Sequence, residues 1–263
     1  MIKLGTYLIG DPVLTPAERL RVIRDVGFDH VGFGISTLAN SAQSGITPDF
    51  CAKLGLKIEN LHLTGSGTHD LWAEGERGDA VADRFCDEIA KCREWGVKTG
   101  VLHAVYGYEQ PAPMGELGLS RFARIVECAE KNGVILALEN SLYDDYLCYI
   151  LDNIQSPCLQ FCFDSGHHHA FAADMDLLGK YGARLGATHL HDNDGAKDQH
   201  LIPFEGSIDW SATARALAAS PHARERICAE ITSGPYKGRA FEDIFSQLFA
   251  QMTRIAQMIE SAK

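Results

Sequence analysis

Short apolar runs alternate with longer amphipathic segments along the whole chain. The apolar runs are rich in β-branched residues, which is typical of buried parallel strands. They predict eight strands: Ile2–Leu8, His30–Ile35, Lys57–His62, Thr99–His103, Val134–Glu139, Leu159–Asp164, Ala187–His191 and Arg226–Glu230. Helical periodicity between them predicts helices near 15–26, 47–54, 77–95, 118–132, 144–154, 173–184, 209–220 and 241–260. This alternation indicates a parallel sheet covered by helices.

The joints between these segments repeat one form, in which a glycine follows a helix and precedes a strand. Such a glycine can adopt the positive φ that ends many helices. The glycines in question are Gly27, Gly55, Gly96, Gly133 and Gly186. Helix starts are marked as well, by a capping box from Thr15 to Glu18 and by Thr47 and Asp209 as capping side chains. The joints therefore indicate a repeated strand–helix unit.

The chain length suits one closed barrel. At 263 residues it is close to the roughly 250 typical of a (β/α)8 barrel, and eight units close such a barrel. We therefore predict a single TIM-barrel domain over residues 1–263. The alternative is a doubly wound open sheet, which usually carries a glycine-rich turn after its first strand. The segment from Leu8 to Pro12 has no such pattern.

The net charge and composition limit the classes of molecule that the protein is expected to bind. The formal net charge of −11 disfavours general affinity for nucleic acid and favours a small-molecule substrate. We find no secretory signal pattern and no apolar run long enough to cross a membrane, so we expect a cytoplasmic protein without a membrane partner. The eight cysteines are scattered without a CxxC pair, which predicts reduced core thiols. A homo-oligomer is compatible with all of these features.

Ionisable residues stand at the ends of six of the eight predicted strands. They are His62, His103, Glu139, Asp164, His191 and Glu230. Charges at the end of an apolar strand are costly unless they are paired or bind a cation. In a (β/α)8 barrel the carboxyl ends of the strands converge on the face that carries active sites. The pattern therefore predicts a divalent-metal site on this face.

Three further residues extend this set of candidate ligands. His167 follows Asp164 by three positions, and Asp198 and His200 lie beyond the seventh strand. Carboxylate and imidazole ligands suit Mn, Co or Zn, with Mg a weaker candidate. By contrast, His189 is expected to be a packed or hydrogen-bonding residue, and His222 an ordinary surface residue.

At these residues the sequence resembles the xylose isomerase-like TIM barrel superfamily, which contains sugar phosphate isomerases/epimerases, ketose 3-epimerases and endonuclease IV. The resemblance is carried by LEN at 138–140, FDSGH at 163–167, HLHDNDG at 189–195, DQH at 198–200, EGSIDW at 205–210 and AEI at 229–231. The ketose epimerases hold one metal with four residues at the ends of strands five to eight. The resemblance implies that Glu139, Asp164, His191 and Glu230 hold the metal here, with Glu139 and Glu230 as the catalytic acid and base.

Endonuclease IV resembles the chain through additional zinc ligands. His62, His103, His167, Asp198 and His200 match these positions, which implies further metal or substrate contacts. The segments that follow His103 and Glu139 depart from the endonuclease pattern. The ketose epimerases in turn have a glutamate and an arginine where Asp194 and Lys197 stand here, so their substrate does not carry over.

The function predicted from these residues is a divalent-metal-dependent isomerase or epimerase of a sugar or sugar phosphate, with proton transfer through an enediolate. Two alternatives share the scaffold: an endonuclease IV-like zinc phosphodiesterase acting on abasic DNA, and a metal-dependent lyase or dehydratase. Lys197, Lys237 and Arg239 are candidates to hold an anionic tail of the substrate, although solvated surface charge is the commoner role of such residues.

Overall fold

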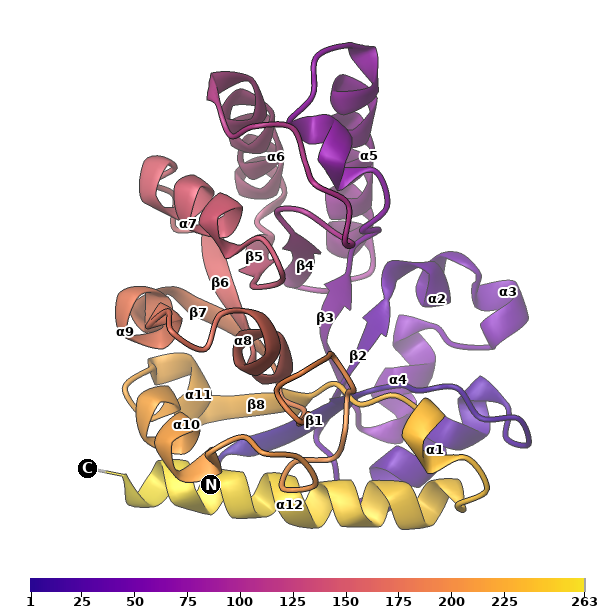
Figure 1. The fold of residues 1–263 in the computed structure, drawn as a ribbon. Helices are drawn as coiled ribbons and strands as arrows, with labels where there is room; N and C mark the ends of the chain where they lie inside the picture. Colours follow the sequence, from indigo (N-terminus) through magenta and orange to yellow (C-terminus); the bar gives the residue numbers. More distant parts are fainter. Residues whose placement is uncertain (263) are drawn as a thin grey trace.

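The computed structural model describes residues 1–262, and its centre is a barrel of eight parallel strands (Figure 1). The strands are β1 Lys3–Tyr7, β2 His30–Gly34, β3 Lys57–His62, β4 Thr99–His103, β5 Ile135–Glu139, β6 Leu159–Asp164, β7 Leu185–His189 and β8 Arg226–Ala229. They are paired in the order β7-β6-β5-β4-β3-β2-β1-β8. Leu190 bridges Ala229 in parallel, and the Cys228 amide donates to Thr188 Oγ1 at 2.8 Å, so contacts between β7 and β8 close the ring. The predicted (β/α)8 barrel is confirmed.

Helices surround this barrel. They are α1 Pro16–Val26, α2 Ile35–Ala39, α3 Ser41–Ser44, α4 Pro48–Leu54, α5 Glu76–Glu94, α6 Glu116–Asn132, α7 Asp144–Asn153, α8 Ser165–Phe171, α9 Leu177–Tyr181, α10 Trp210–Leu217, α11 Pro221–Glu225 and α12 Phe241–Ser261. Short 3-10 helices are η1 Thr68–Leu71, η2 Gly182–Arg184 and η3 Gly234–Tyr236. In Figure 1, α12 runs below β1 and β8, while α5 and α6 pack side by side at the top.

The helix boundaries follow the sequence signals. Thr15 accepts a hydrogen bond from the Glu18 amide and Glu18 accepts one from the Thr15 amide, which completes the predicted capping box. Thr47 and Asp209 cap α4 and α10 through their side chains. Four of the five predicted joint glycines have positive φ: Gly27, Gly55, Gly96 and Gly133.

Two side-chain layers fill the barrel on the β4–β7 side. Val101, Ala137, Cys162 and Ala187 form a buried cluster separate from the main core. Each lies two residues before a polar residue that ends its strand: His103, Glu139, Asp164 or His189. Because side chains two positions apart in a strand share a face, the small apolar layer supports the polar layer directly.

The structure differs from the prediction around the seventh strand. Gly186 lies inside β7, and its lack of a side chain accommodates Gln160, whose Oε1 would lie 2.3 Å from an added Cβ. The strand therefore spans Leu185–His189 rather than Ala187–His191. The helix predicted near 173–184 is reduced to α9 and η2, while α8 begins directly after Asp164.

The cysteine prediction was wrong for one pair. Cys86 in α5 and Cys128 in α6 form a disulfide, while the other six cysteines are free. The two helices are neighbours around the barrel, which brings residues 42 positions apart in sequence within bonding distance. Spacing along the chain carried no sign of this pairing.

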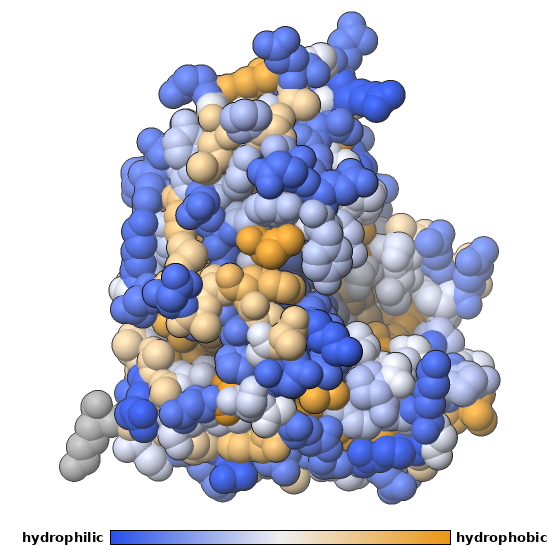
Figure 2. Space-filling model, viewed as in Figure 1, coloured by the Kyte–Doolittle hydropathy of each residue, from blue (hydrophilic) through white to orange (hydrophobic). Residues whose placement is uncertain are grey.

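The visible outer surface is largely hydrophilic, with small hydrophobic patches between charged side chains (Figure 2). Among the described residues, no helix is both long and apolar enough to span a bilayer.

Candidate metal centre

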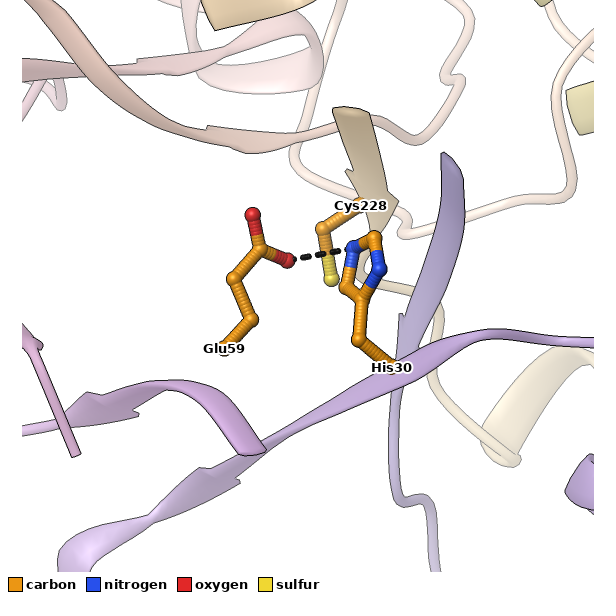
Figure 3. Close-up of side chains that lie close together, drawn as sticks. All are labelled: His30, Glu59 and Cys228. Atoms are coloured by element: carbon orange, nitrogen blue, oxygen red, sulfur yellow. Dashed lines mark ion pairs between the residues drawn. The ribbon is translucent and has the colours of Figure 1, made fainter. Parts of the chain in front are cut away.

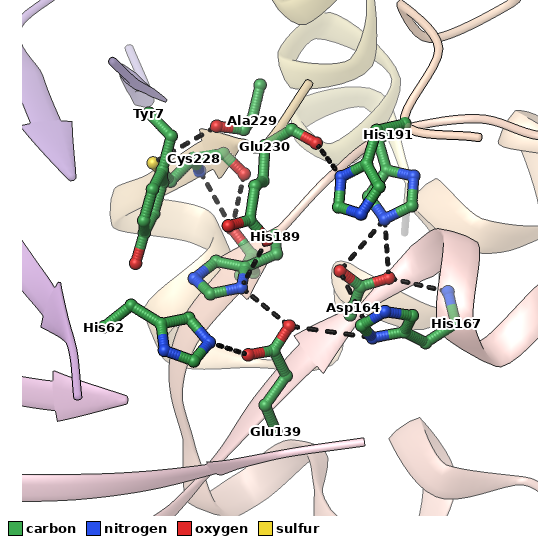
Figure 4. Close-up of polar contacts among 12 residues, drawn as sticks. Tyr7, His62, Glu139, Asp164, His167, His189, His191, Cys228, Ala229 and Glu230 are labelled. Atoms are coloured by element: carbon green, nitrogen blue, oxygen red, sulfur yellow. Dashed lines mark hydrogen bonds and ion pairs between the residues drawn. The ribbon is translucent and has the colours of Figure 1, made fainter. Parts of the chain in front are cut away.

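The polar strand ends face a cavity of about 510 Å³, a volume typical of small-molecule sites. Figure 4 shows several of these side chains in contact: Glu139 with His62 and His189, and Asp164 with His191. The ionisable residues that line this cavity are Tyr7, His62, His103, Tyr106, Glu139, His167, Asp198, His200 and Glu230. The predicted convergence of distant strand ends on one face is therefore present in the structure.

A central group of four side chains comes from strands five to eight. Glu139, Asp164, His189 and Glu230 each present one ligand atom, and these atoms lie within 4.8 Å of one another. The barrel register explains the grouping, because β6 and β7 pair Asp164 with His189, and β4 and β5 pair His103 with Glu139. Three carboxylates and one imidazole thus occupy neighbouring positions at the end of the barrel.

His189 links the two glutamates of this group. Its Nδ1 atom lies 2.8 Å from Glu139 Oε1 and 3.0 Å from Glu230 Oε2. Burial alone would lower the pKa of His189, but Cys162 and the adjacent carboxylates of Glu139 and Glu230 outweigh it and raise the pKa well above its usual value. Burial alone would raise the pKa of Glu230, yet His189 lowers it to about 2. In the same way His189 holds the pKa of Glu139 well below its usual range, against the effect of burial.

Asp164 belongs to the central group of four side chains and also caps the helix that follows it. Its Oδ1 atom accepts a 2.7 Å hydrogen bond from the His167 amide, which caps the start of α8. The Asn140 side chain fixes the Asp164 backbone: its Nδ2 atom donates to the Asp164 carbonyl oxygen, and its Oδ1 atom accepts from the Asp164 backbone N–H. The capping contact explains why a helix follows β6 without a loop.

The structure places His191, predicted from the family resemblance as the fourth ligand, one layer beyond the central group. Its Nε2 atom lies 3.0 Å from Asp164, and its ring stacks on that of His200 with centroids 3.9 Å apart. The physical reason is the register of β7, which ends at His189 and sets that residue opposite Asp164. His189, expected to be a packed or hydrogen-bonding residue, does form hydrogen bonds and also occupies the position between Glu139 and Glu230.

A second group lies on the β3–β4 side. His62 Nε2 is 3.0 Å from Glu139 Oε2, and His103 Nε2 is 3.4 Å from the same oxygen. Burial raises the cost of a charge on His103 and lowers its pKa to about 4. His62, His103 and Glu139 form a set of atoms mutually close enough to hold a metal. Glu139 therefore belongs to two such sets.

A third group is formed by His167, Asp198 and His200. Asp198 Oδ2 lies 3.0 Å from His200 Nε2 and 3.3 Å from His167 Nε2. Burial opposes a charge on His200, but the hydrogen bond with Asp198 raises its pKa to about 9. The second and third groups together contain five of the six residues that the sequence suggested as additional contacts, and Lys197 lies outside them.

The segment that carries Asp198 and His200 is held in place by Asp192. Its carboxylate accepts hydrogen bonds from Trp210 Nε1 at 2.7 Å and from the amides of Phe204 and Ile208. Backbone hydrogen bonds between Asp192 and Leu201 run in both directions, and His200 has a positive φ of 50°. Asp192 thus joins the HLHDNDG and EGSIDW motifs, a role that the sequence alone did not reveal.

No lysine or arginine among the described residues lines this cavity or the adjoining one of about 310 Å³. Lys197, Lys237 and Arg239 are exposed and lie outside both linings. The second cavity shares His103, Tyr106, His167 and Asp198 with the first and adds Leu142 and Phe171. The three candidates to hold an anionic tail therefore have the exposure of solvated surface charges.

Comparison with known proteins agrees with this architecture. The protein y4fM of Sinorhizobium fredii is 27% identical over 285 residues, covering 93% of this chain and 89% of y4fM. The structure of IolI with a bound zinc atom superposes with a TM-score of 0.79 at 17% identity, covering 99% of this chain and 100% of IolI. L-ribulose 3-epimerase gives a TM-score of 0.78 at 18% identity, with coverages of 99% and 96%. At these identities the two structures establish a shared fold.

The sequence itself matches the family described as "Xylose isomerase-like TIM barrel" over residues 20–248, which is most of its length. That match, the closed ring of eight parallel strands and the polar groups at their carboxyl ends agree with one another. The chain belongs to the xylose isomerase-like TIM barrel family.

Proposed function

We propose that this protein is a divalent-metal-dependent isomerase or epimerase that acts on a small sugar by proton transfer. One observation carries the proposal: Glu139, Asp164, His189 and Glu230, from four successive strands, present ligand atoms within 4.8 Å of one another. The epimerase and zinc-bound neighbours in the same fold support this assignment. The carboxyl end of the barrel is also the face where enzymes of this architecture have their active sites.

The residues present fit a divalent ion. The buried carboxylates of Glu139 and Asp164 and the partly buried carboxylate of Glu230 repel one another at this distance unless positive charge offsets them. Among the described residues, imidazoles form ion pairs with all three. A dication offsets two of the three negative charges with the imidazoles neutral. An N/O donor set without thiolate suits Mn, Co or Zn. Bound there, the ion would supply an electrophile for the carbonyl and neighbouring hydroxyl of the sugar.

The two glutamates differ in how free they are to move a proton. Glu139 is 1% exposed, and its oxygens contact His189, His62 and His103. The Glu230 side chain is 19% exposed and lines the cavity, so one of its oxygens is accessible to a substrate. We therefore assign the first proton transfer to Glu230. In a two-base epimerisation Glu139 is assigned the second transfer, in which it would pass to the opposite face of the substrate carbon a proton received from His62, whose Nε2 atom lies 3.0 Å from Glu139 Oε2.

The cavity favours a neutral sugar over a sugar phosphate. Its described lining contains histidines, carboxylates, tyrosines and small residues but no lysine or arginine. A protein that holds a phosphate usually offers guanidinium, ammonium or backbone amide donors in a nest. Leu142 and Phe171 in the adjoining cavity suit an apolar face of the substrate.

The test is solvent exchange with the metal-loaded protein in deuterated water, using a panel of neutral ketoses and their phosphates. Deuterium at a carbon next to the carbonyl, dependent on added metal and lost in Glu230→Gln, supports the proposal. Asp209→Asn, at the exposed start of α10, is the matched control and should retain exchange. Metal binding without exchange on any sugar in the panel would overturn it.

One observation favours a second candidate, a metal-dependent phosphodiesterase. His62, His103 and Glu139 on one side and His167, Asp198 and His200 on the other form further groups suited to metals. Clustered ions activate water for attack on phosphorus. The net charge of −11 and the absence of lysine and arginine from the described cavity lining count against a nucleic-acid substrate. Incision of an abasic duplex by protein loaded with several metal equivalents would favour this candidate.

A further inference from the structure

A second cluster of metal-ligating side chains lies inside the barrel, away from the carboxyl ends of the strands. His30 is the first residue of β2, Glu59 lies in β3, and Cys228 precedes Glu230 by two positions in β8 (Figure 3). The register pairs His30 with Gly5, and Gly5 with Cys228. The three side chains therefore meet below the candidate metal centre, toward the amino-terminal end of the barrel.

We propose that His30, Glu59 and Cys228 form a separate binding site for a thiophilic divalent cation such as Zn²⁺. Their ligand atoms lie within 4.8 Å of one another, and His30 Nε2 is 2.6 Å from Glu59 Oε2. This set of imidazole, carboxylate and thiolate donors is one that zinc accepts. The site is distinct from the proposed catalytic function and does not depend on it.

Burial and unmet hydrogen bonding support the site. The side chains of His30 and Glu59 are 4% and 6% exposed, and Cys228 is fully buried. His30 Nε2 and both Glu59 oxygens have no partner with hydrogen-bond geometry among the described residues. Buried polar atoms without such partners are rare, and an absent ion is one of their recognised causes.

The surrounding residues leave room for the cluster. A Cβ atom added to Gly5 would lie 2.0 Å from the His30 ring, so Gly5 provides the space that this imidazole occupies. His222, predicted to be a surface residue, has a side chain that is only 8% exposed, and its Nε2 atom lies 3.8 Å from Glu59 Oε1. It is the nearest candidate for a fourth ligand.

The charges of the ligands suit a dication. One thiolate and one carboxylate together offset its two positive charges, which lowers the cost of burying them. Arg226 Nε lies 3.5 Å from Glu59 Oε1, so the guanidinium contacts the oxygen that does not face His30. Bound there, the ion would join β2, β3 and β8 and so fix the strand that carries Glu230.

Cobalt spectroscopy can test the site, because a Co²⁺–thiolate bond gives a near-ultraviolet charge-transfer band that oxygen and nitrogen ligands do not give. The protein is produced in medium supplemented with Co²⁺, and metal content is measured on the purified chain. We expect the band in the wild type, its loss in Cys228→Ser with one metal equivalent less, and its retention in Glu230→Gln.

Cys162→Ser is the matched control, because Cys162 is the buried cysteine beside Glu139 and His189. It should retain the band. If Cys228→Ser does not fold, the near-isosteric Glu59→Gln decides, with an expected loss of one equivalent. A wild type without the band, or a band and a metal content unchanged in the folded variant, would overturn the proposal.

Discussion

The Nδ1 atom of His189 lies 2.8 Å from Glu139 Oε1, which joins two residues 50 positions apart in the sequence. The same atom lies 3.0 Å from Glu230, so one imidazole connects β5, β7 and β8 at the end of the barrel. His191, two residues later, contacts Asp164 and His200 instead. The two histidines therefore occupy different positions relative to a bound metal.

The first prediction separates these two histidines. We expect His189→Asn to lower metal affinity more strongly than His191→Asn, because only His189 lies between the two glutamates. Loss of a residue that supports a ligand typically costs about 10–100-fold in affinity. We expect His191→Asn to fall in this range and His189→Asn to exceed it, in competition titrations with a chromogenic chelator. The reverse order would return the ligand role to His191.

The second prediction concerns pH. Despite burial, neighbouring carboxylates raise the pKa values of His62 and His167 above their usual value and that of His200 to about 9, and Cys162, Glu139 and Glu230 raise that of His189. In the metal-free protein at neutral pH the His167, His189 and His200 rings carry protons, and a ring that binds a metal must lose its proton. Affinity should therefore rise with pH between about 6 and 9. Calorimetry in buffers of different ionisation enthalpy should show proton release, and binding without it would contradict the protonation states described here.

The third prediction compares the two glutamates. Glu230→Gln should reduce solvent exchange by about 10²–10⁴-fold, the usual effect of losing a general acid or base. Glu139→Gln should reduce it as well and should weaken metal binding more than Glu230→Gln does, because the Glu139 carboxylate contacts four histidines whereas Glu230 contacts His189. Metal content and exchange are measured on the same samples. Equal metal loss in both variants would contradict the different roles that we assign to the buried Glu139 and the more exposed Glu230.

The fourth prediction concerns stability and Asp144, the first residue of α7. Burial raises the pKa of this side chain from 3.8 to about 7, although it accepts a 2.6 Å hydrogen bond from the Ser141 amide. The folded state thus holds the proton more tightly than the unfolded state, so stability falls as pH rises from about 4 to 7. Asp144→Asn should remove this dependence and stabilise the protein at pH 8 by about 1–3 kcal/mol. Parallel urea denaturation curves of both proteins from pH 5 to pH 8 check this, and identical pH slopes would contradict it.

The fifth prediction concerns the Cys86–Cys128 disulfide. It closes a loop with a sequence separation of 42, for which the chain-entropy estimate is about 4 kcal/mol of stabilisation. Cys86→Ser should therefore lower the free energy of unfolding under non-reducing conditions. Cys51→Ser, at a buried free cysteine in α4, is the comparison, and only the wild type and this control should respond to reductant. Equal stability with and without reductant would show that the bond makes no contribution.

The barrel could be predicted because its signals are local. The capping box at Thr15 and the positive-φ glycines such as Gly27 and Gly133 mark helix ends within a few residues. The strand between two such marks has little freedom in where it lies. For this reason seven predicted strands agree with the observed ones to within one residue at either end.

The sequence did not show that His189, and not His191, lies between the two glutamates, because this depends on the register of β7 against β6. Gly186 looked like a glycine that ends a helix, which moved the predicted seventh strand two residues toward the C-terminus. With the strand displaced in this way, His191 was predicted to end it, whereas His189 does. In the structure Gly186 instead makes room for Gln160 from β6, a contact between strands that no local pattern reveals.

The disulfide and the cluster of His30, Glu59 and Cys228 could not be predicted for a related reason. Cys86 and Cys128 meet only because α5 and α6 are adjacent, and His30 and Cys228 meet only because β1 lies between β2 and β8. These encounters depend on the closed ring. The residues that end a strand are easier to identify, because their polarity contrasts with the apolar run before them.

The Asp192 carboxylate accepts hydrogen bonds from Trp210, Phe204 and Ile208. The residues around the cavity therefore fall into two sets that are held in place in different ways. The strand-end residues are fixed by the barrel itself, whereas Asp198 and His200 belong to a segment anchored outside it. Lengthening or shortening that segment between Gly195 and His200 would re-space one group of ligands and leave the ring of strands untouched. Descendants of this scaffold can thus acquire new chemistry by exchanging a single connection, with the folding core inherited unchanged.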